Sequence, residues 1–229
     1  MPAKNSTKEY LENSYYHIYN RGVEKRLIFL DEQDYSVFLS YLKEYLLPKN
    51  TNELYNIISN PNSSWREKDK ANKLLRMNNF FGKITLLAYC LMPNHFHLLV
   101  KQTSANSIDV FMNSLATRYT MYFNKKYKRV GTLYQAQYKA VIVSTDEQLL
   151  CLSRYIHHQD LASQGNALRS WQAQPSSYPD YLGKRKTEWV KPEEILSFFS
   201  KTNPLLSYKT FVESTDQDLF PITKLVIED

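Results

Sequence analysis

Two histidines separated by one residue, His95 and His97, are the side chains in this sequence best suited to bind a metal ion. They follow a turn signal, Met-Pro-Asn at 92–94, and apolar stretches lie on both sides of them. Because side chains alternate along a strand, both imidazoles should point to the same face of it. A histidine pair alone is a weak signal, so its meaning depends on a third ligand and a reactive partner elsewhere in the chain.

The candidate partners, Tyr155 and Gln159, lie in a later segment with a helical pattern. Residues four apart share one face of a helix. A phenol can act as a nucleophile, and a carboxamide oxygen can complete a three-ligand site with two imidazoles. Mixed nitrogen and oxygen ligation suits Mg²⁺ or Mn²⁺ better than the thiolate-rich sites of structural Zn²⁺. The sequence therefore predicts a divalent-metal site beside a tyrosine nucleophile.

Apolar periodicity predicts the elements that must position these residues. We expect strands or extended segments at 15–20, 83–92, 95–102 and 131–143, and helices at 31–47, 107–126 and 147–158. The order of the first six elements is that of a ferredoxin-like split βαβ core with an antiparallel sheet. The class predicted is therefore α+β, and the helix that carries Tyr155 should pack beside the sheet.

Two segments lie outside this core pattern. Residues 48–80 are polar and Asn-rich, which indicates an insertion, with a helix expected at 64–77. Residues 185–229 contain two short amphipathic patterns at 192–199 and 205–213, which indicate a helical C-terminal extension. We expect residues 1–184 to form one domain. The patterns leave the roles of the insertion and the extension open.

The composition favours a polyanionic partner. The chain has a net charge of +6 with 18 Tyr and 11 Phe. The segment 118–140 carries six cations and no acidic residue, with tyrosines interleaved among them. Cations neutralise phosphates and rings stack on unpaired bases, so this segment predicts a nucleic-acid surface. A basic surface without any partner is the competing interpretation of the charge.

Other function classes find no support in the sequence. The chain has five glycines and lacks the Gly-rich phosphate-loop patterns. Its two cysteines do not make a disulfide framework, which fits a reducing compartment. The N-terminal residues lack the apolar core of a signal peptide, and no stretch reaches the roughly 20 apolar residues of a membrane span. We therefore expect a cytoplasmic protein that does not enter a membrane.

Four ordered segments resemble one known superfamily. They read YYHIYNRG at 15–22, PNHFHLLV at 93–100, GTLYQ at 131–135 and RYI at 154–156. This set resembles the HUH endonucleases and, within them, the single-tyrosine transposases: the REP-associated tyrosine transposases and their insertion-sequence relatives. The resemblance implies a metal-dependent transposase or endonuclease that cleaves and rejoins single-stranded DNA near hairpins.

The resemblance also implies roles for individual residues. His95 and His97 match the metal-binding histidines, Tyr155 matches the nucleophile that forms a 5′-phosphotyrosine, and Gln159 stands where the third ligand is supplied. Two positions depart from the REP-associated pattern. Gln159-Asp160 replaces the usual Asn-Pro, and Gln137 replaces a usual Arg.

The cations expected to contact DNA come from several segments. Arg21 follows the first strand and could hold a phosphate, with a surface salt bridge as the alternative. His158 could contact DNA or stand at a helix end. The full set of expected contacts is Arg21, Arg118, Lys125, Lys126, Lys128, Arg129, Lys139, Arg154 and His158.

Two rival functions remain open at the level of sequence. A domesticated relative would recognise DNA hairpins without cutting them. A metal hydrolase would use the histidine pair to activate water, with Tyr155 incidental. The sequence also leaves open the DNA target, and whether the protein acts as a monomer or a homodimer.

Overall fold

The core is a four-stranded antiparallel sheet with the strand order β2-β3-β1-β4. In the computed structural model, which describes residues 10–164 and 175–214, the strands are β1 (Ser14–Arg21), β2 (Ile84–Met92), β3 (His95–Gln102) and β4 (Lys139–Val143). Helix α1 (Glu32–Leu46) joins β1 to β2, and α4 (Ser107–Lys126) joins β3 to β4. This is the predicted ferredoxin-like split βαβ arrangement, and the α+β class is confirmed.

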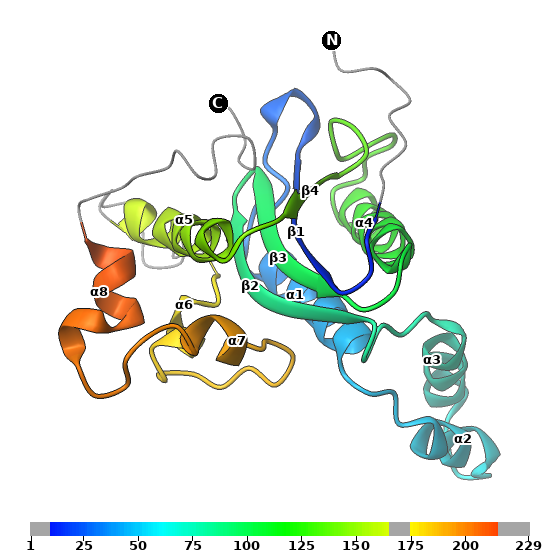
Figure 1. Ribbon diagram of the computed structural model, residues 1–229. Helices are drawn as coiled ribbons and strands as arrows, with labels where there is room; N and C mark the ends of the chain where they lie inside the picture. Colours follow the sequence, from blue (N-terminus) through cyan, green and yellow to red (C-terminus); the bar gives the residue numbers. More distant parts are fainter. Residues whose placement is uncertain (1–9, 165–174, 215–229) are drawn as a thin grey trace.

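The two faces of the sheet bury different helices (Figure 1). Tyr16, Phe96 and Leu98 belong to a large apolar cluster with side chains of α1 and α4. The opposite face contributes Leu99 and Val143 to a second cluster with the helix α5 (Asp146–Gln164). Because strand side chains alternate, β3 serves both clusters, and its histidines fall on the α5 side.

Helix starts follow the expected capping chemistry. The side chain of Asp31 accepts the backbone N–H of Asp34 at the start of α1. The hydroxyl of Thr145 accepts the N–H of Gln148 at the start of α5. These caps satisfy N–H groups that have no partner inside the helix. The helices α1 and α5 begin within one residue of the predicted starts at 31 and 147.

The polar insertion folds as a helical hairpin. It contains α2 (Thr51–Ser59), which was not expected, and α3 (Trp65–Arg76), which confirms the predicted helix. Ser64 and Glu67 form a reciprocal capping box at the start of α3. The pair projects away from the sheet at the lower right of Figure 1.

The segment after α5 packs onto that helix and onto β2. It contains α6 (Tyr178–Tyr181), α7 (Glu193–Leu196), η3 (Pro204–Leu206) and α8 (Tyr208–Glu213). Ile195, Tyr208 and Val212 share the second apolar cluster with Leu152 and Ile156 of α5. The described part of the predicted extension therefore shares a core with α5, while a boundary at 184 stays a prediction.

Three expectations about extended and helical segments need correction. Only Lys139–Val143 of the segment 131–143 is a strand, because residues before it turn to bridge the end of β1 through Tyr134. The helix expected at 192–199 has four residues, Glu193–Leu196. The last helix begins at Tyr208 rather than at 205, after the short turn η3 (Pro204–Leu206).

Neither cysteine forms a disulfide, and only Cys90 is fully buried. Within residues 10–164 and 175–214, none of the helices is long and apolar enough to cross a membrane.

Candidate functional site

The strand register brings the candidate residues to one sheet face. In the antiparallel pairing of β1 with β3, Tyr19 lies opposite His97 and Arg21 lies opposite His95. Side chains two residues apart on a strand share a face, so His17 joins this group. The two histidines lie on one side of the central strand β3, as predicted, and the register places them beside polar residues of β1.

His97 lies at the centre of a group of aromatic rings. Its side chain is fully buried. The ring centroid lies 5.0 Å from that of His95 at 87° and 5.1 Å from that of His17 at 15°. The ring of Tyr19 lies 6.1 Å away. This packing holds the imidazole of His97 in one orientation.

Tyr155 reaches the same group from α5. Its ring centroid lies 5.5 Å from that of His97, with the two planes at 90°. The neighbouring residues Leu152 and Ile156 are buried in the apolar cluster beneath α5, which anchors the helix against the sheet. The predicted nucleophile and one predicted ligand thus meet within a single chain.

The environment of His97 keeps its imidazole neutral. Burial lowers the pKa of His97 well below its ordinary value, and the nearby charges of His17, His95 and Arg21 lower this pKa further. A neutral imidazole retains a lone pair for a metal ion. The Nε2 atom of His97 is buried and has no hydrogen-bond partner within the part of the chain that the structure describes. Such an atom is costly unless something binds it, so the chemistry of this position fits a metal ligand.

The third predicted ligand, Gln159, is of another residue type. Among the described residues, no group of three or more His, Cys, Asp or Glu side chains is arranged to hold a metal ion. Gln159 follows Tyr155 by one helical turn on α5 and is partly buried. Its amide oxygen is of the type that Mg²⁺ and Mn²⁺ accept.

Backbone hydrogen bonds join three of the four sequence segments that carry the family resemblance, at the end of the sheet nearest His95. The N–H of Gly22 donates to the carbonyl of Asn94 at 2.8 Å, and Ile28 donates to Pro93 at 2.8 Å. Gln135 donates to the carbonyl of Arg21 at 2.9 Å. The loop after β1 therefore supports both the turn before His95 and the irregular segment before β4.

Gly22 is required in this loop because there is no room for a side chain. A Cβ at this position would lie 2.2 Å from the carbonyl oxygen of Arg26. We expect Gly22→Ala to lower the free energy of unfolding by about 1–3 kcal/mol, as overpacking does. Chemical denaturation would measure this change. Gly131→Ala is the control: its Cβ would meet open space, although its positive φ still costs about 1 kcal/mol. Wild-type stability of Gly22→Ala would contradict the steric argument.

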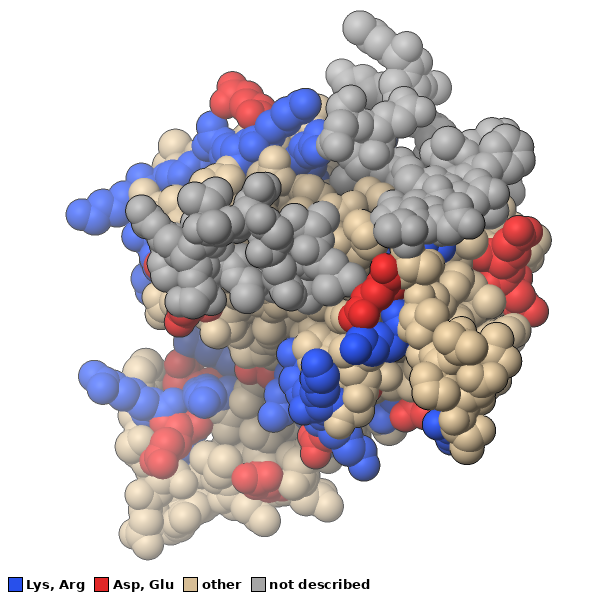
Figure 2. Space-filling view, turned by 90° about the vertical axis from the view of Figure 1, so that its left-hand side faces the viewer, with Lys and Arg blue, Asp and Glu red and all other residues tan. Residues whose placement is uncertain are grey.

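Several of the predicted DNA-contacting cations are accessible. Lys125, Lys128 and Lys139 are exposed, and the partly exposed ones are Arg21, Arg129 and His158. Lys139 lies opposite Tyr19 in the sheet, on the histidine face. Figure 2 shows the side of the molecule that bears α5 and α8, where Lys and Arg side chains gather along the upper left edge.

Two of the residues predicted to contact DNA, Arg118 and Arg154, form contacts within the protein. Arg118 forms an ion pair with Glu44 at 2.6 Å and stacks on the ring of Tyr41. Arg154 donates to the backbone oxygen of Ser214 at 2.8 Å and to its hydroxyl at 2.9 Å, which ties α5 to the end of α8. Both guanidinium groups therefore have structural contacts within the protein, and their contact with DNA stays a prediction.

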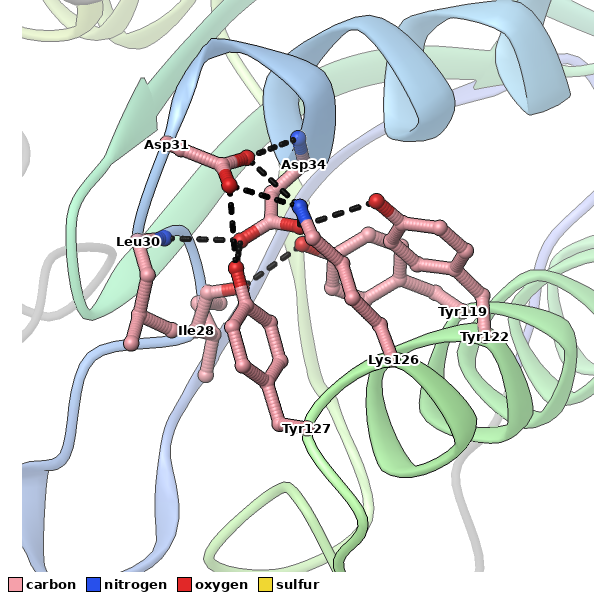
Figure 3. Close-up of polar contacts among 8 residues, drawn as sticks. All are labelled: Ile28, Leu30, Asp31, Asp34, Tyr119, Tyr122, Lys126 and Tyr127. Atoms are coloured by element: carbon pink, nitrogen blue, oxygen red, sulfur yellow. Dashed lines mark hydrogen bonds and ion pairs between the residues drawn. The ribbon is translucent and has the colours of Figure 1, made fainter.

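Lys126 is a third predicted DNA contact that forms ion pairs within the protein (Figure 3). Its ammonium lies 2.7 Å from Asp31 and 2.8 Å from Asp34, whose side chain is fully buried. Tyr122 and Tyr127 also donate to Asp34. Burial alone lowers the pKa of Lys126, but the hydrogen bonds to both aspartates raise it above its ordinary value. The charge of Lys126 therefore compensates a buried carboxylate and joins α4 to α1.

Lys125 and Lys126 make a matched pair for a test. Lys126→Met should lower the free energy of unfolding by roughly 2 kcal/mol, less than a fully buried pair would lose, because the lysine is partly exposed and the tyrosine hydroxyls remain. Lys125→Met should change stability by under about 0.5 kcal/mol. If Lys125 contacts a phosphate, its loss should also reduce the salt slope of DNA binding by about 1. Urea denaturation and DNA titrations at several salt concentrations would measure both variants. Equal losses of stability in Lys125→Met and Lys126→Met would contradict the role of Lys126 in neutralising Asp34.

Two further histidines have partners that the sequence analysis did not identify. His17 lies on β1, and its Nε2 lies 2.9 Å from Nδ1 of His97. His157 is fully buried between Tyr208 and Ser177. The alternation of β1 predicted that His17 and Tyr19 share a face, but no local pattern revealed the strand register that brings them to His97.

Comparisons with known proteins agree with this geometry. Residues 63–159, a segment that contains both histidines, Tyr155 and Gln159, match the family described as "Transposase IS200 like". Among solved structures, the chain is similar to a REP-associated tyrosine transposase bound to a REP hairpin. The sequence identity is 7%, the TM-score is 0.50, and the match covers 82% of this chain and 97% of that chain.

A Deinococcus radiodurans protein described as a transposase is 17% identical over 68% of this chain and 97% of that chain, with a TM-score of 0.28 that supports no argument. No curated protein matches the chain. The family match over residues 63–159 and the shared fold agree with the predicted resemblance to the tyrosine transposases. Within that class, the matching segment of this chain is IS200-like.

Proposed function

We propose that this protein cleaves and rejoins single-stranded DNA next to hairpins, with Tyr155 as the nucleophile. The observation that carries the proposal is the contact between the rings of Tyr155 and His97. It joins a group capable of covalent catalysis to a buried imidazole whose Nε2 has no protein partner among the described residues. Both come from one chain, which supports a site built by a monomer.

In the proposed cleavage step, the phenolic oxygen of Tyr155 attacks the phosphorus of a phosphodiester. The phenol gives up its proton to solvent as a bond forms between that oxygen and phosphorus, and the bond from phosphorus to the 3′ oxygen breaks. The 3′ oxygen takes a proton and leaves as a hydroxyl. The phosphate stays on Tyr155 as a 5′-phosphotyrosine, and attack by another 3′-hydroxyl reverses the step. The phosphodiester energy is retained, so rejoining needs no nucleotide cofactor.

His95, His97 and Gln159 are the residues that we propose to hold a divalent metal, Mg²⁺ or Mn²⁺. When bound, such an ion supplies Lewis acidity toward a non-bridging phosphate oxygen. The neutral state of His97 suits this role, because a protonated imidazole cannot ligate. The packing of His97 between His17 and Tyr155 fixes the direction in which its Nε2 points.

The accessible cations are proposed to hold the DNA strand around this site. Lys139 and Arg21 lie at the same sheet face and end as the histidines, and His158 lies on α5. Lys125, Lys128 and Arg129 form a basic tip at and after the end of α4. The structural neighbour was solved with a REP hairpin, and a hairpin is proposed as the DNA partner here as well.

The test is a search for a covalent protein–DNA adduct. The full chain is incubated with a hairpin oligonucleotide that has single-stranded flanks, labelled at its 3′ end, in Mg²⁺ or Mn²⁺, and then denatured. The label should migrate with the protein, because a 5′-phosphotyrosine retains the downstream strand. Cleavage without an adduct would identify a hydrolase, and retention without cleavage a DNA-binding protein. Either result would contradict the proposal.

A further inference from the structure

We propose that His17 and Asn94 are positioning residues that hold His97 and His95, respectively, in the tautomer with the proton on Nδ1 and the lone pair on Nε2. The inference rests on the proposed metal site and deepens it. Each histidine has its Nδ1 within hydrogen-bond distance of another side chain, and the two partners come from different parts of the fold. A metal-binding histidine whose second nitrogen is held in this way keeps both its ring orientation and its proton position.

Asn94 determines the proton position on His95. Its Oδ1 lies 2.6 Å from Nδ1 of His95. Its Nδ2 donates to the backbone carbonyl of Lys25 at 3.3 Å, so the amide oxygen is the atom that faces the ring. A carboxamide oxygen only accepts hydrogen bonds, so Nδ1 of His95 must carry the proton. In the neutral ring, the lone pair is then on Nε2.

His17 has the corresponding relation to His97. Its Nε2 lies 2.9 Å from Nδ1 of His97, and both side chains are fully buried. If His17 donated in this bond, the proton of neutral His97 would sit on Nε2, as a buried N–H with no partner among the described residues. If His97 donates, Nε2 keeps a lone pair that a bound metal can use. Only the second arrangement is compatible with ligation.

The fold places both supports without direct help from α5. His17 and His97 lie on neighbouring strands, and the register sets Tyr19 opposite His97, so His17 is the diagonal neighbour on the same face. Asn94 belongs to the turn between β2 and β3, and its backbone carbonyl accepts the N–H of Gly22. The loss of either side chain should therefore affect a histidine while leaving the sheet pairing in place.

The first measurement is the nitrogen chemical shifts of the histidines in the metal-free, ¹⁵N-histidine-labelled full chain. We expect Nδ1 of His95 and His97 to show the protonated shift and Nε2 the unprotonated shift. An Nε2–H tautomer at either ring in the wild-type protein would overturn the inference for that ring. This readout does not depend on metal or DNA, so it decides the inference even if no covalent adduct forms.

The second measurement is Mn²⁺ affinity by calorimetry for matched variants. His17→Phe keeps a ring and removes the acceptor, and it should weaken Mn²⁺ binding by about 10- to 100-fold. His17→Gln supplies an amide oxygen in place of Nε2 and should recover most of that loss. At His95, Asn94→Ala removes the acceptor and Asn94→Asp keeps an acceptor oxygen, so the same order of Mn²⁺ affinities is expected. Tyr19→Phe is the control, since it keeps the ring that lies beside His97 and removes only a hydroxyl.

The outcomes separate the possibilities. Wild-type Mn²⁺ affinity in His17→Phe would overturn the positioning role of His17. An equal loss in His17→Gln and His17→Phe would also overturn it and would indicate that His17 acts as a ligand itself. If His17→Phe does not fold, the nitrogen chemical shifts of the wild type and of His17→Gln still test which nitrogen of His97 carries the proton. Absence of Mn²⁺ binding in the wild type would contradict the proposed metal site, while the chemical shifts would report on the tautomers separately.

Discussion

Tyr155→Phe is expected to abolish the covalent protein–DNA adduct, with a loss of more than about 10³-fold in the cleavage rate. Phenylalanine keeps the ring that packs against His97 but lacks the oxygen that must bond to phosphorus. The helix around it should remain in place, because Leu152 and Ile156 anchor α5 in the apolar cluster. Hairpin binding should therefore persist while cleavage is lost. The measurement is the denaturing gel shift of the 3′-labelled hairpin together with a binding titration.

Tyr19→Phe is the matched control for this prediction. Its ring also lies beside His97, at a centroid distance of 6.1 Å, but the side chain belongs to β1 and is buried. We expect this variant to form the adduct. An adduct that persists in Tyr155→Phe would show that another residue is the nucleophile, and loss of the adduct in Tyr19→Phe alone would point to Tyr19.

Acidification from pH 7 to pH 4.5 is expected to lower the free energy of unfolding by roughly 3 kcal/mol through His157 alone. This side chain is fully buried in a network that joins three elements. Its Nδ1 lies 2.6 Å from the hydroxyl of Tyr208 on α8, and its Nε2 lies 2.7 Å from the hydroxyl of Ser177, next to α6. Burial lowers the pKa of His157 to about 3 in the folded protein.

The direction of the effect follows from this lowered pKa. The unfolded chain binds a proton at His157 below about pH 6.5, whereas the folded protein does so only near pH 3. The stability that neutral His157 contributes is therefore complete above about pH 6.5. It falls by about 1.4 kcal/mol per pH unit between these two values. His97, whose pKa is also lowered, adds to the loss in the same direction.

Urea denaturation at several pH values would measure this effect, with His157→Gln as the control. Glutamine can still donate to one hydroxyl and accept from the other, but it does not titrate. We expect this variant to be somewhat less stable at pH 7 and to lose less stability on acidification. An unchanged pH dependence in His157→Gln would refute the assignment. Because the network connects α5 to α6 and α8, it also assigns the described part of the C-terminal segment a structural role in holding the helix that carries Tyr155.

Local patterns in the sequence were sufficient to predict most of the elements. Apolar stretches on both sides of a turn signal predicted the hairpin that carries His95 and His97, and helical periodicity predicted α4 at Ser107–Lys126 and the starts of α1 and α5 to within one residue. These properties depend on neighbours within one turn or one strand, and the chain itself contains them. The order of the elements then restricted the topology to the split βαβ arrangement that the sheet has.

The partners of individual side chains were decided only by the tertiary structure. The sequence by itself determined that His17 lies on a strand, but the β1–β3 register placed it 2.9 Å from His97. The basic segment 118–140 predicted a nucleic-acid surface, and the packing of α4 on α1 gives Lys126 of that segment a buried carboxylate to neutralise. Side-chain period tells which face a residue occupies, and charge tells what it can attract. Neither the side-chain period nor the charge specifies the register between distant segments, because that register is set by the burial of the whole apolar face.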